Sequence, residues 1–162
     1  MNDDRATTVP RRVLVVGLGN PDRGDDGIGR QVIQDLDGRL PPDVSVLARS
    51  GDLLSLVEDW DGFDALVCVD AAAGTAAPGR VHRFDLATRA LPREASFASS
   101  HDVGLAEAVE LARALGTAPG DIVVYAVEGA CFECGASLTP DVAAVRHDVA
   151  DLVIAEVNRL RQ

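Results

Sequence analysis

The sequence of 162 residues lacks several features that would define a specialised class of protein. It contains no lysine, so arginine supplies all 15 basic residues, and 26 acidic residues bring the formal net charge to -11. A surface this acidic makes nucleic acid and anionic membranes poor partners, and we expect neither. No run of about 18 apolar residues is present, so no segment of the sequence predicts a membrane-spanning helix.

Cysteine is also scarce, with three residues at Cys68, Cys131 and Cys134. An odd, sparse set of cysteines is typical of a protein from a reducing cytoplasm, where we expect this one to reside. Residues 1–11 are polar and mixed in charge, without the apolar core of a secretory signal, and predict a disordered lead-in. The remaining residues, 12–162, fit a single domain, which we expect to be a monomer.

Short aliphatic runs alternate with segments of helical periodicity through residues 12–162. The expected strands are 12–17, 44–48, 65–69, 81–84 and 122–127, and the expected helices are 25–40, 53–57, 102–115 and one that begins at Thr139-Pro140. About ten residues separate the third and fourth strands, too few for a helical crossover, so the fourth strand should run antiparallel. The pattern predicts a three-layer α/β/α sandwich around a five-stranded, mostly parallel sheet.

The most informative segment is the turn after the first expected strand, from Gly19 to Gly29. It is rich in glycine, as a phosphate-binding turn would be, but it contains three aspartates, Asp22, Asp25 and Asp26. Carboxylates repel phosphate, whose binding requires bare backbone N–H groups. This turn is therefore suited to presenting oxygen ligands to a cation.

Topology brings candidate ligands together at one edge of the sheet. In a doubly wound sheet the ligand lies beyond the carboxyl ends of the strands where strand order reverses, which places Asp26 near Asp70 at the end of the third strand. His101, at the entrance to the third main helix, follows a long loop and could complete a site for a divalent metal. Each residue also has a structural interpretation: Asp25 or Asp26 could cap the first helix, and Asp70 could bind backbone donors. We expect Asp25 to be the cap and Asp26 the ligand.

Other residues with chemical potential favour structural roles. His82 and His147 are expected at the surface, Asp102 at the start of the third main helix, and Cys68 in the core. Cys131 and Cys134 have the spacing of a redox or metal clip, but a closed zinc site needs four ligands and no second cysteine pair exists. We therefore expect that pair to be structural or incidental. The sequence contains neither a Gly-x-Ser-x-Gly nucleophile elbow nor a His-Glu-x-x-His pair.

Several motifs together resemble the hydrogenase maturation protease family. They are Val15-Val16-Gly17-Leu18-Gly19-Asn20, Asp25-Asp26-Gly27-Ile28-Gly29, Val69-Asp70-Ala71, Ser100-His101-Asp102-Val103-Gly104-Leu105, Val127-Glu128-Gly129 and Leu138-Thr139-Pro140-Asp141-Val142. The resemblance extends from about residue 12 to 160, and it implies a phosphorylase/hydrolase-like fold. In position, Asp26, Asp70 and His101 match the family's metal-binding residues. The cysteine pair is not a feature of the family.

The resemblance also implies a substrate and a reaction. The family removes a C-terminal extension from the large-subunit precursor of a [NiFe] hydrogenase after nickel insertion. Asp26, Asp70 and His101 would then contact nickel carried by the substrate, and water would attack the peptide with the metal or a carboxylate activating it. Three alternatives are a non-enzymatic metal-binding assembly chaperone, a nucleotide-binding domain and a peptidyl-tRNA hydrolase. The last shares the Gly17–Pro21 opening but needs an early histidine, and the first histidine here is His82.

Overall fold

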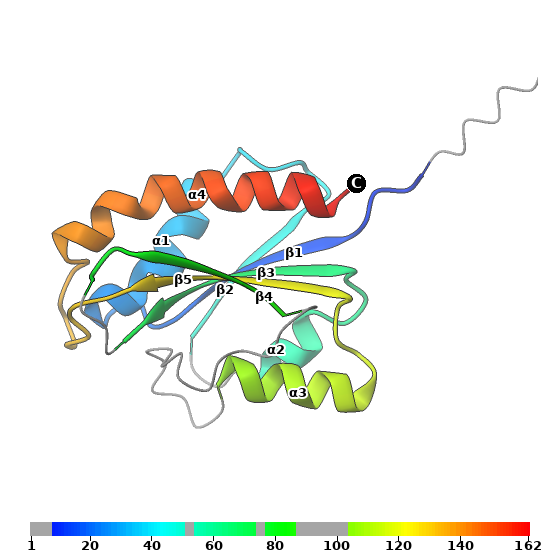
Figure 1. Ribbon diagram of the computed structural model, residues 1–162, viewed down its shortest axis with the longest axis horizontal. Coiled ribbons are helices and arrows are strands. Elements are labelled where there is room, and N and C mark those ends of the chain that lie inside the picture. The colour runs from blue at the N-terminus through cyan, green and yellow to red at the C-terminus, as the bar shows by residue number, and fades with distance from the viewer. Residues whose placement is uncertain (1–7, 51–53, 74–76, 87–103) are drawn as a thin grey trace, which may run out of the picture.

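The computed structural model describes residues 8–50, 54–73, 77–86 and 104–162 of the chain. His101 and Asp102, two residues singled out above, lie outside these ranges. The elements appear in Figure 1, coloured from blue at the N-terminus to red at the C-terminus. Among the helices in these ranges, none combines the length and the apolar character needed to cross a bilayer.

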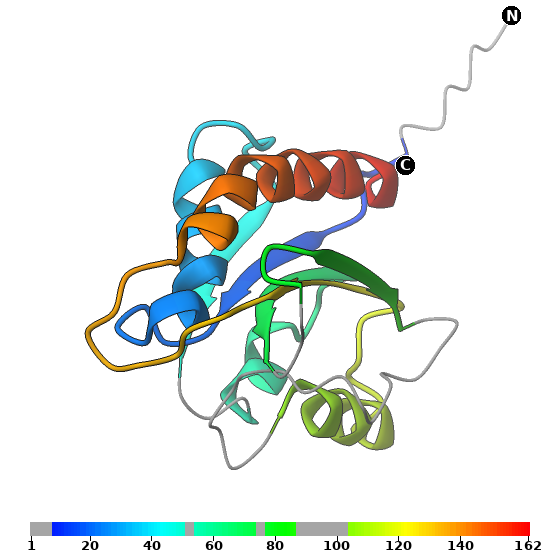
Figure 2. The same ribbon diagram turned by 60° about the vertical axis from the view of Figure 1, so that its left-hand side comes forward.

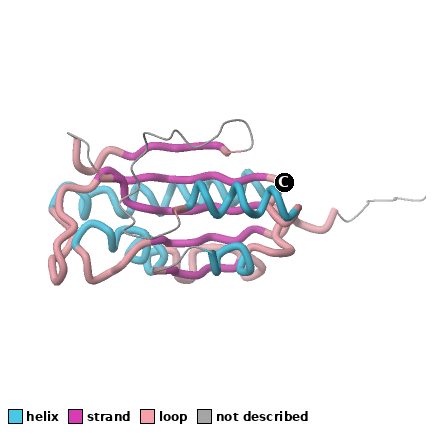
Figure 3. The backbone as a smooth tube through the Cα atoms, turned by 90° about the horizontal axis from the view of Figure 1, so that it is seen from below, coloured by secondary structure: helices cyan, strands magenta, loops and turns pink. Residues whose placement is uncertain are grey.

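A five-stranded sheet forms the centre of the molecule, in the order β2-β1-β3-β5-β4. The strands are β1 (Val13–Leu18), β2 (Ser45–Arg49), β3 (Ala65–Ala72), β4 (Val81–Asp85) and β5 (Asp121–Glu128). The pairs β1–β2, β1–β3 and β3–β5 are parallel, and β4 pairs antiparallel with β5 at one edge. Figure 3 shows the strands running side by side. The predicted mixed sheet with one antiparallel strand is confirmed.

Helices cover both faces of the sheet, which completes the predicted three layers (Figures 1 and 2). One face carries α1 (Ile28–Asp35) and α4 (Pro140–Leu160), and the other carries α2 (Leu54–Asp59) and α3 (Leu105–Leu115). A short 3-10 helix, η1 (Gly24–Gly27), connects β1 to α1. Because β1 lies next to β3 and the helices after β1 and β2 cover opposite faces, the strand order reverses between β1 and β3.

Alternate residues of each strand enter two separate cores. In β3, Val67 and Val69 pack in the cluster that includes α1 and α4, whereas Leu66 and Cys68 pack in the cluster that includes α2 and α3. This alternation follows from the pleat of a strand, in which successive side chains point to opposite faces. Each fully buried aliphatic side chain contributes about 1.5–3 kcal/mol by leaving water. Cys68 lies in the core, as predicted.

Element boundaries differ from the expectations in four places. The first α-helix begins at Ile28, after the 3-10 helix η1, rather than at Asp25 or Asp26. The first α-helix ends at Asp35 rather than near residue 40, because the chain turns through Gly38, whose φ of 70° is left-handed. Strand β3 continues to Ala72, so Asp70 lies inside the strand instead of ending it. The third main helix is described from Leu105, after an extended Gly104. The extension of β3 follows from its pairing with β5, which continues to Glu128.

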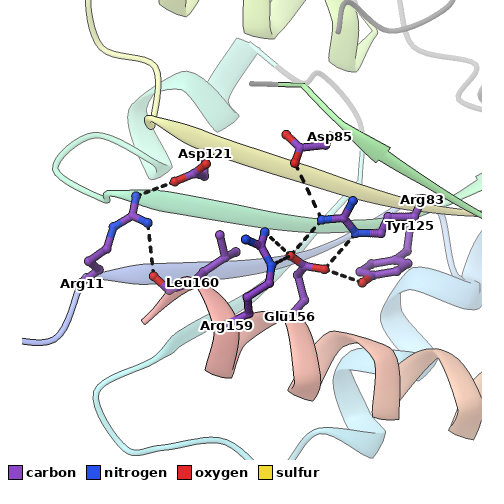
Figure 4. A network of polar contacts seen from close by, with 8 residues as sticks. All are labelled: Arg11, Arg83, Asp85, Asp121, Tyr125, Glu156, Arg159 and Leu160. Carbon is purple, nitrogen blue, oxygen red and sulfur yellow. Dashed lines mark hydrogen bonds and ion pairs between the residues drawn. The ribbon is translucent and has the colours of Figure 1, made fainter. Parts of the chain in front are cut away.

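A buried acidic residue, Glu156 of α4, connects that helix to the edge of the sheet (Figure 4). Its carboxylate accepts hydrogen bonds from the Tyr125 hydroxyl at 2.8 Å and from Arg83 Nε at 2.9 Å. Arg159, one turn further along α4, donates to the same carboxylate. Burial raises the pKa of Glu156, but the bonds from Arg83, Tyr125 and Arg159 outweigh it and lower the pKa to about 2. The network therefore attaches the antiparallel edge strand β4 to α4.

Candidate functional site

Two buried aspartates lie at the carboxyl edge of β1 and β3. Asp26 belongs to η1, which directly follows β1, and Asp70 belongs to the last part of β3. Helix η1 contacts β3, and the charge of Asp26 acts on the carboxyl of Asp70. The structure thus brings together these two predicted residues, and the reversal of strand order between β1 and β3 is the reason.

The local backbone positions the Asp26 carboxylate. Asp26 is 1% exposed, and its Oδ2 accepts a hydrogen bond of 2.8 Å from the Asn20 N–H. Gly19 has a φ of 112°, and a Cβ at that position would lie 2.2 Å from the Asp26 carbonyl oxygen and 2.8 Å from its Oδ1. Both the backbone conformation and the close approach therefore require glycine at position 19.

Asp70 is fully buried and only partly satisfied. Its Oδ1 accepts a 2.8 Å hydrogen bond from the Ala71 N–H, whereas its Oδ2 has no hydrogen-bond partner among the residues that the structure describes. Burial raises the pKa of Asp70 to about 8, with the negative charge of Asp26 adding to the rise and the Ala71 bond opposing it. A buried carboxyl with one oxygen unoccupied, next to a second carboxylate, is a suitable ligand for a divalent cation.

Asp25 holds a loop in place, and the prediction that it caps the first helix is wrong. Its Oδ2 accepts from the N–H groups of Ala130 and Cys131 at 2.7 and 3.0 Å, and its Oδ1 accepts from the Thr139 N–H at 2.7 Å. Burial raises its pKa, but these hydrogen bonds and one from the Thr139 hydroxyl lower it below the ordinary value. Asp25 thus connects the acidic turn to the segment between β5 and α4, a long-range contact that no local pattern indicates.

Cys131 and Cys134 lie in the segment that Asp25 holds. Both thiols are free; Cys131 is partly buried and Cys134 is exposed. The backbone of Cys131 makes two hydrogen bonds to Asp25 of the acidic turn. Its N–H donates to the Asp25 carboxylate, and its carbonyl accepts from the Asp25 N–H at 2.8 Å. Across the described ranges, no three residues among His, Cys, Asp and Glu lie close enough to hold a metal ion. The backbone of Cys131 thus has a structural role, and the role of the two thiols stays a prediction.

The third predicted ligand, His101, lies outside the described residues. The helix that follows it in sequence, α3, ends at Leu115, and β5 begins at Asp121 soon afterwards. Since β5 runs toward the carboxyl edge of the sheet, α3 runs in the opposite direction and begins on the side where Asp26 and Asp70 lie (Figure 2). A ligand from the segment before α3 stays a prediction.

His82, expected at the surface, is instead held by a buried acid. Its Nε2 lies 2.6 Å from Oε1 of Glu128, and only a third of its side chain is exposed. Glu128, the last residue of β5, is 5% exposed. The alternation of β4 could have revealed this position, because His82 shares a face with Phe84, which packs in a core cluster. His147, by contrast, is exposed on α4, as predicted.

Comparisons with known proteins agree on one family. The family model for hydrogenase maturation protease, HycI, matches residues 32–156, a range that includes positions 70 and 101 and begins just after Asp26. The chain is 31% identical over 153 residues to the hydrogenase expression/formation protein HupD of Bradyrhizobium diazoefficiens, covering 90% of this chain and 79% of HupD. It is 30% identical over 150 residues to the hydrogenase 2 maturation protease of Escherichia coli, covering 89% of both.

Solved structures extend the similarity to three dimensions. The hydrogenase maturating endopeptidase HybD from E. coli superimposes with a TM-score of 0.76 at 25% identity, covering 91% of this chain and 93% of HybD. A maturation protease HycI from Thermococcus kodakarensis gives a TM-score of 0.73 at 23% identity, covering 96% of both chains, which shows the shared fold.

Proposed function

This chain belongs to the hydrogenase maturation protease family, and we propose that it removes the C-terminal extension of a [NiFe] hydrogenase large-subunit precursor once nickel has been inserted. The observation that carries this proposal is the pair of buried aspartates, Asp26 and Asp70, at the reversal point of the sheet. The cytoplasm, where we expected this chain from its cysteines, is the proposed compartment.

The chemistry of the two acids supports recognition of a cation that arrives with the substrate. With no cation nearby, Asp70 holds its proton near neutral pH, because its pKa is raised to about 8 by burial. A divalent ion would displace that proton and bind to Oδ2 of Asp70. Two carboxylates and the imidazole of His101 would leave coordination positions to ligands from the precursor. In this proposal, nickel belongs to the substrate.

The hydrolytic step needs a positioned water beside the scissile peptide. When bound, nickel supplies Lewis acidity toward a coordinated oxygen. Asp26, whose Oδ2 is held by the Asn20 N–H, and Asp70 fix the position of the precursor's metal centre, and one of them can accept the proton of the attacking water. The carbonyl carbon gains the hydroxyl, and the amine of the extension leaves with the proton.

The test is incubation of the purified chain with nickel-loaded and nickel-free precursor, followed by mass spectrometry of the precursor. A peptidase that reads substrate nickel shortens only the loaded form. Equal shortening of both forms would contradict recognition of nickel, and an unchanged mass for both would favour the metal-binding chaperone.

We expect substitution of the proposed ligands to stop processing while the fold persists. His101→Ala, Asp26→Asn and Asp70→Asn should each lower the rate at least about 100-fold, because each removes a contact to the metal centre. The exposed His147 provides the matched control, since His147→Ala removes an imidazole from the surface of α4 that faces Asp35. Full processing by His101→Ala, with circular dichroism unchanged, would remove that residue from the site.

A further inference from the structure

The proposed function leaves one hydrogen-bonded pair at the same edge of the sheet unused. The imidazole of His82 on β4 is 2.6 Å from the carboxylate of Glu128 at the end of β5. The Glu128 side chain is 7% exposed, whereas that of His82 is 33% exposed. The pair therefore has a buried acid that fixes the ring and a ring that a bound molecule can reach.

The strand register places His82 level with Asp70. Asp70 of β3 pairs with Ala126 of β5, and Ala126 pairs with His82 of β4, so the three residues form one row across the sheet. Neighbouring strands are about 4.8 Å apart, so about 10 Å separates the backbones of Asp70 and His82. Only the methyl group of Ala126 stands between them in this row.

All members of the row project from the same face. Cys68, Val124 and Phe84, two residues away from Asp70, Ala126 and His82 respectively, pack in the core cluster beneath α2 and α3. Because side chains alternate along a strand, Asp70, Ala126 and His82 share that face. Glu128, two residues beyond Ala126, also lies on it. Asp70 and the His82–Glu128 pair therefore border a common strip at the carboxyl edge.

The hydrogen bond determines what His82 can offer. A carboxylate accepts hydrogen bonds, so in the neutral imidazole Nε2 of His82 donates to Glu128 and Nδ1 is left as an acceptor. An extended peptide presents a backbone N–H every second residue on one side and advances about 3.3 Å per residue. A span of about 10 Å therefore corresponds to three residues of extended chain.

We propose that His82, oriented by Glu128, is a positioning residue for the precursor: its Nδ1 accepts a backbone N–H of the extended substrate segment, about three residues from the part held at Asp70. This inference rests on the proposed function and adds a second contact point to it. The His82–Glu128 pair contacts the substrate chain, whereas Asp26 and Asp70 contact its metal centre.

The test compares steady-state processing of nickel-loaded precursor by four variants, His82→Phe, His82→Gln, Glu128→Gln and His147→Phe. His82→Phe keeps a ring beside Phe84, with which His82 is stacked at 6.2 Å between centroids, but removes the acceptor. We expect His82→Phe to raise KM about tenfold, the effect of one lost hydrogen bond, with kcat within about twofold of the parent. His82→Gln keeps an acceptor oxygen and should recover part of the affinity, and Glu128→Gln should also raise KM.

His147→Phe is the matched control, because His147 also faces a carboxylate, with Nδ1 3.4 Å from Asp35, but on a helix over the opposite face. It should leave KM and kcat unchanged. A parental KM for His82→Phe would overturn the proposal, and so would a fall in kcat that merely follows the folded fraction measured by circular dichroism. If the parent chain itself shortens no precursor, the proposed function fails as well, and the two failures are thus distinguished by the parent's own activity.

Discussion

At the scale of single residues, the site is defined by the different surroundings of three aspartates. Asp25 is surrounded by donors and has a lowered pKa, whereas Asp70 has one bonded oxygen, a charged neighbour and a raised pKa. Asp26 directly follows Asp25 in the same turn, and its Oδ2 accepts a hydrogen bond from the Asn20 N–H. Identical side chains thus serve as a structural anchor and as candidate ligands, and the number of donors around each one decides which.

Asp70→Asn should stabilise the fold at alkaline pH while it stops processing. The pKa of Asp70 is about 8 in the folded chain and near 3.8 in the unfolded chain, so folding favours the protonated form. Stability is therefore highest below the unfolded value and falls as pH rises through 8. Because a tenfold change in proton affinity is worth about 1.4 kcal/mol, the variant should gain about 2 kcal/mol or more at pH 9.

Thermal unfolding of both proteins between about pH 3 and 9 checks this expectation. The two curves should converge near pH 3, below the unfolded value of 3.8, where the carboxyl is mostly protonated in both states. Asp61→Asn, at an exposed position, is the control and should follow the parent. A variant less stable than the parent at pH 9 would show that the Asp70 charge is compensated in the folded chain.

At the scale of elements, the acidic turn and the segment before α4 depend on one another. Asp25→Ala leaves three part-buried backbone N–H groups, of Ala130, Cys131 and Thr139, without their acceptor. We expect a loss of about 3 kcal/mol in the free energy of unfolding, measured by urea denaturation at pH 7. Asp22→Ala, an exposed acid in the same turn, should cost less than about 0.5 kcal/mol. Equal losses for both would mean that the hydrogen bonds of Asp25 add nothing.

Because Glu156 attaches β4 to α4 as a carboxylate, we expect its contribution to the free energy of unfolding to disappear in acid. The pKa of Glu156 is lowered to about 2 from 4.5, so its stabilisation is complete above 4.5 and disappears as pH falls through 2. Glu156→Gln should lose about 2–3 kcal/mol at pH 7 and approach the parent near pH 2. Denaturation at both pH values measures this, and a loss that is independent of pH would indicate packing rather than charge as its cause (Figure 4).

At the scale of the whole molecule, charge is the dominant property. A net charge of -11 on 162 residues makes copies of the chain repel one another at low ionic strength. We therefore expect sedimentation equilibrium in low salt to give the monomer mass of 17.0 kDa. A dimer that persists under these conditions would contradict the expected monomer and require an interface strong enough to overcome this repulsion.

The fold was predictable because its signals are local. Aliphatic runs such as Val13–Val16 mark strands, helical spacing marks the helices, and the short connection before Val81 sets the antiparallel strand. These patterns require only that each segment bury one face. The proximity of Asp26 and Asp70 was also predictable, because parallel strands end at a common edge and the order reverses between β1 and β3.

The layers, the mixed sheet and the acidic turn follow from the amino-acid sequence alone, since each depends on residues close together along the chain. Tertiary folding selected the aspartate that anchors a loop and brought His82 to Glu128, 46 residues away. It also decided that Glu156 holds the edge strand, through partners on β4 and β5. Hydrogen bonds and burial between distant segments arise only when the sheet assembles, and they set the charge and position of each side chain, which sequence periodicity does not contain.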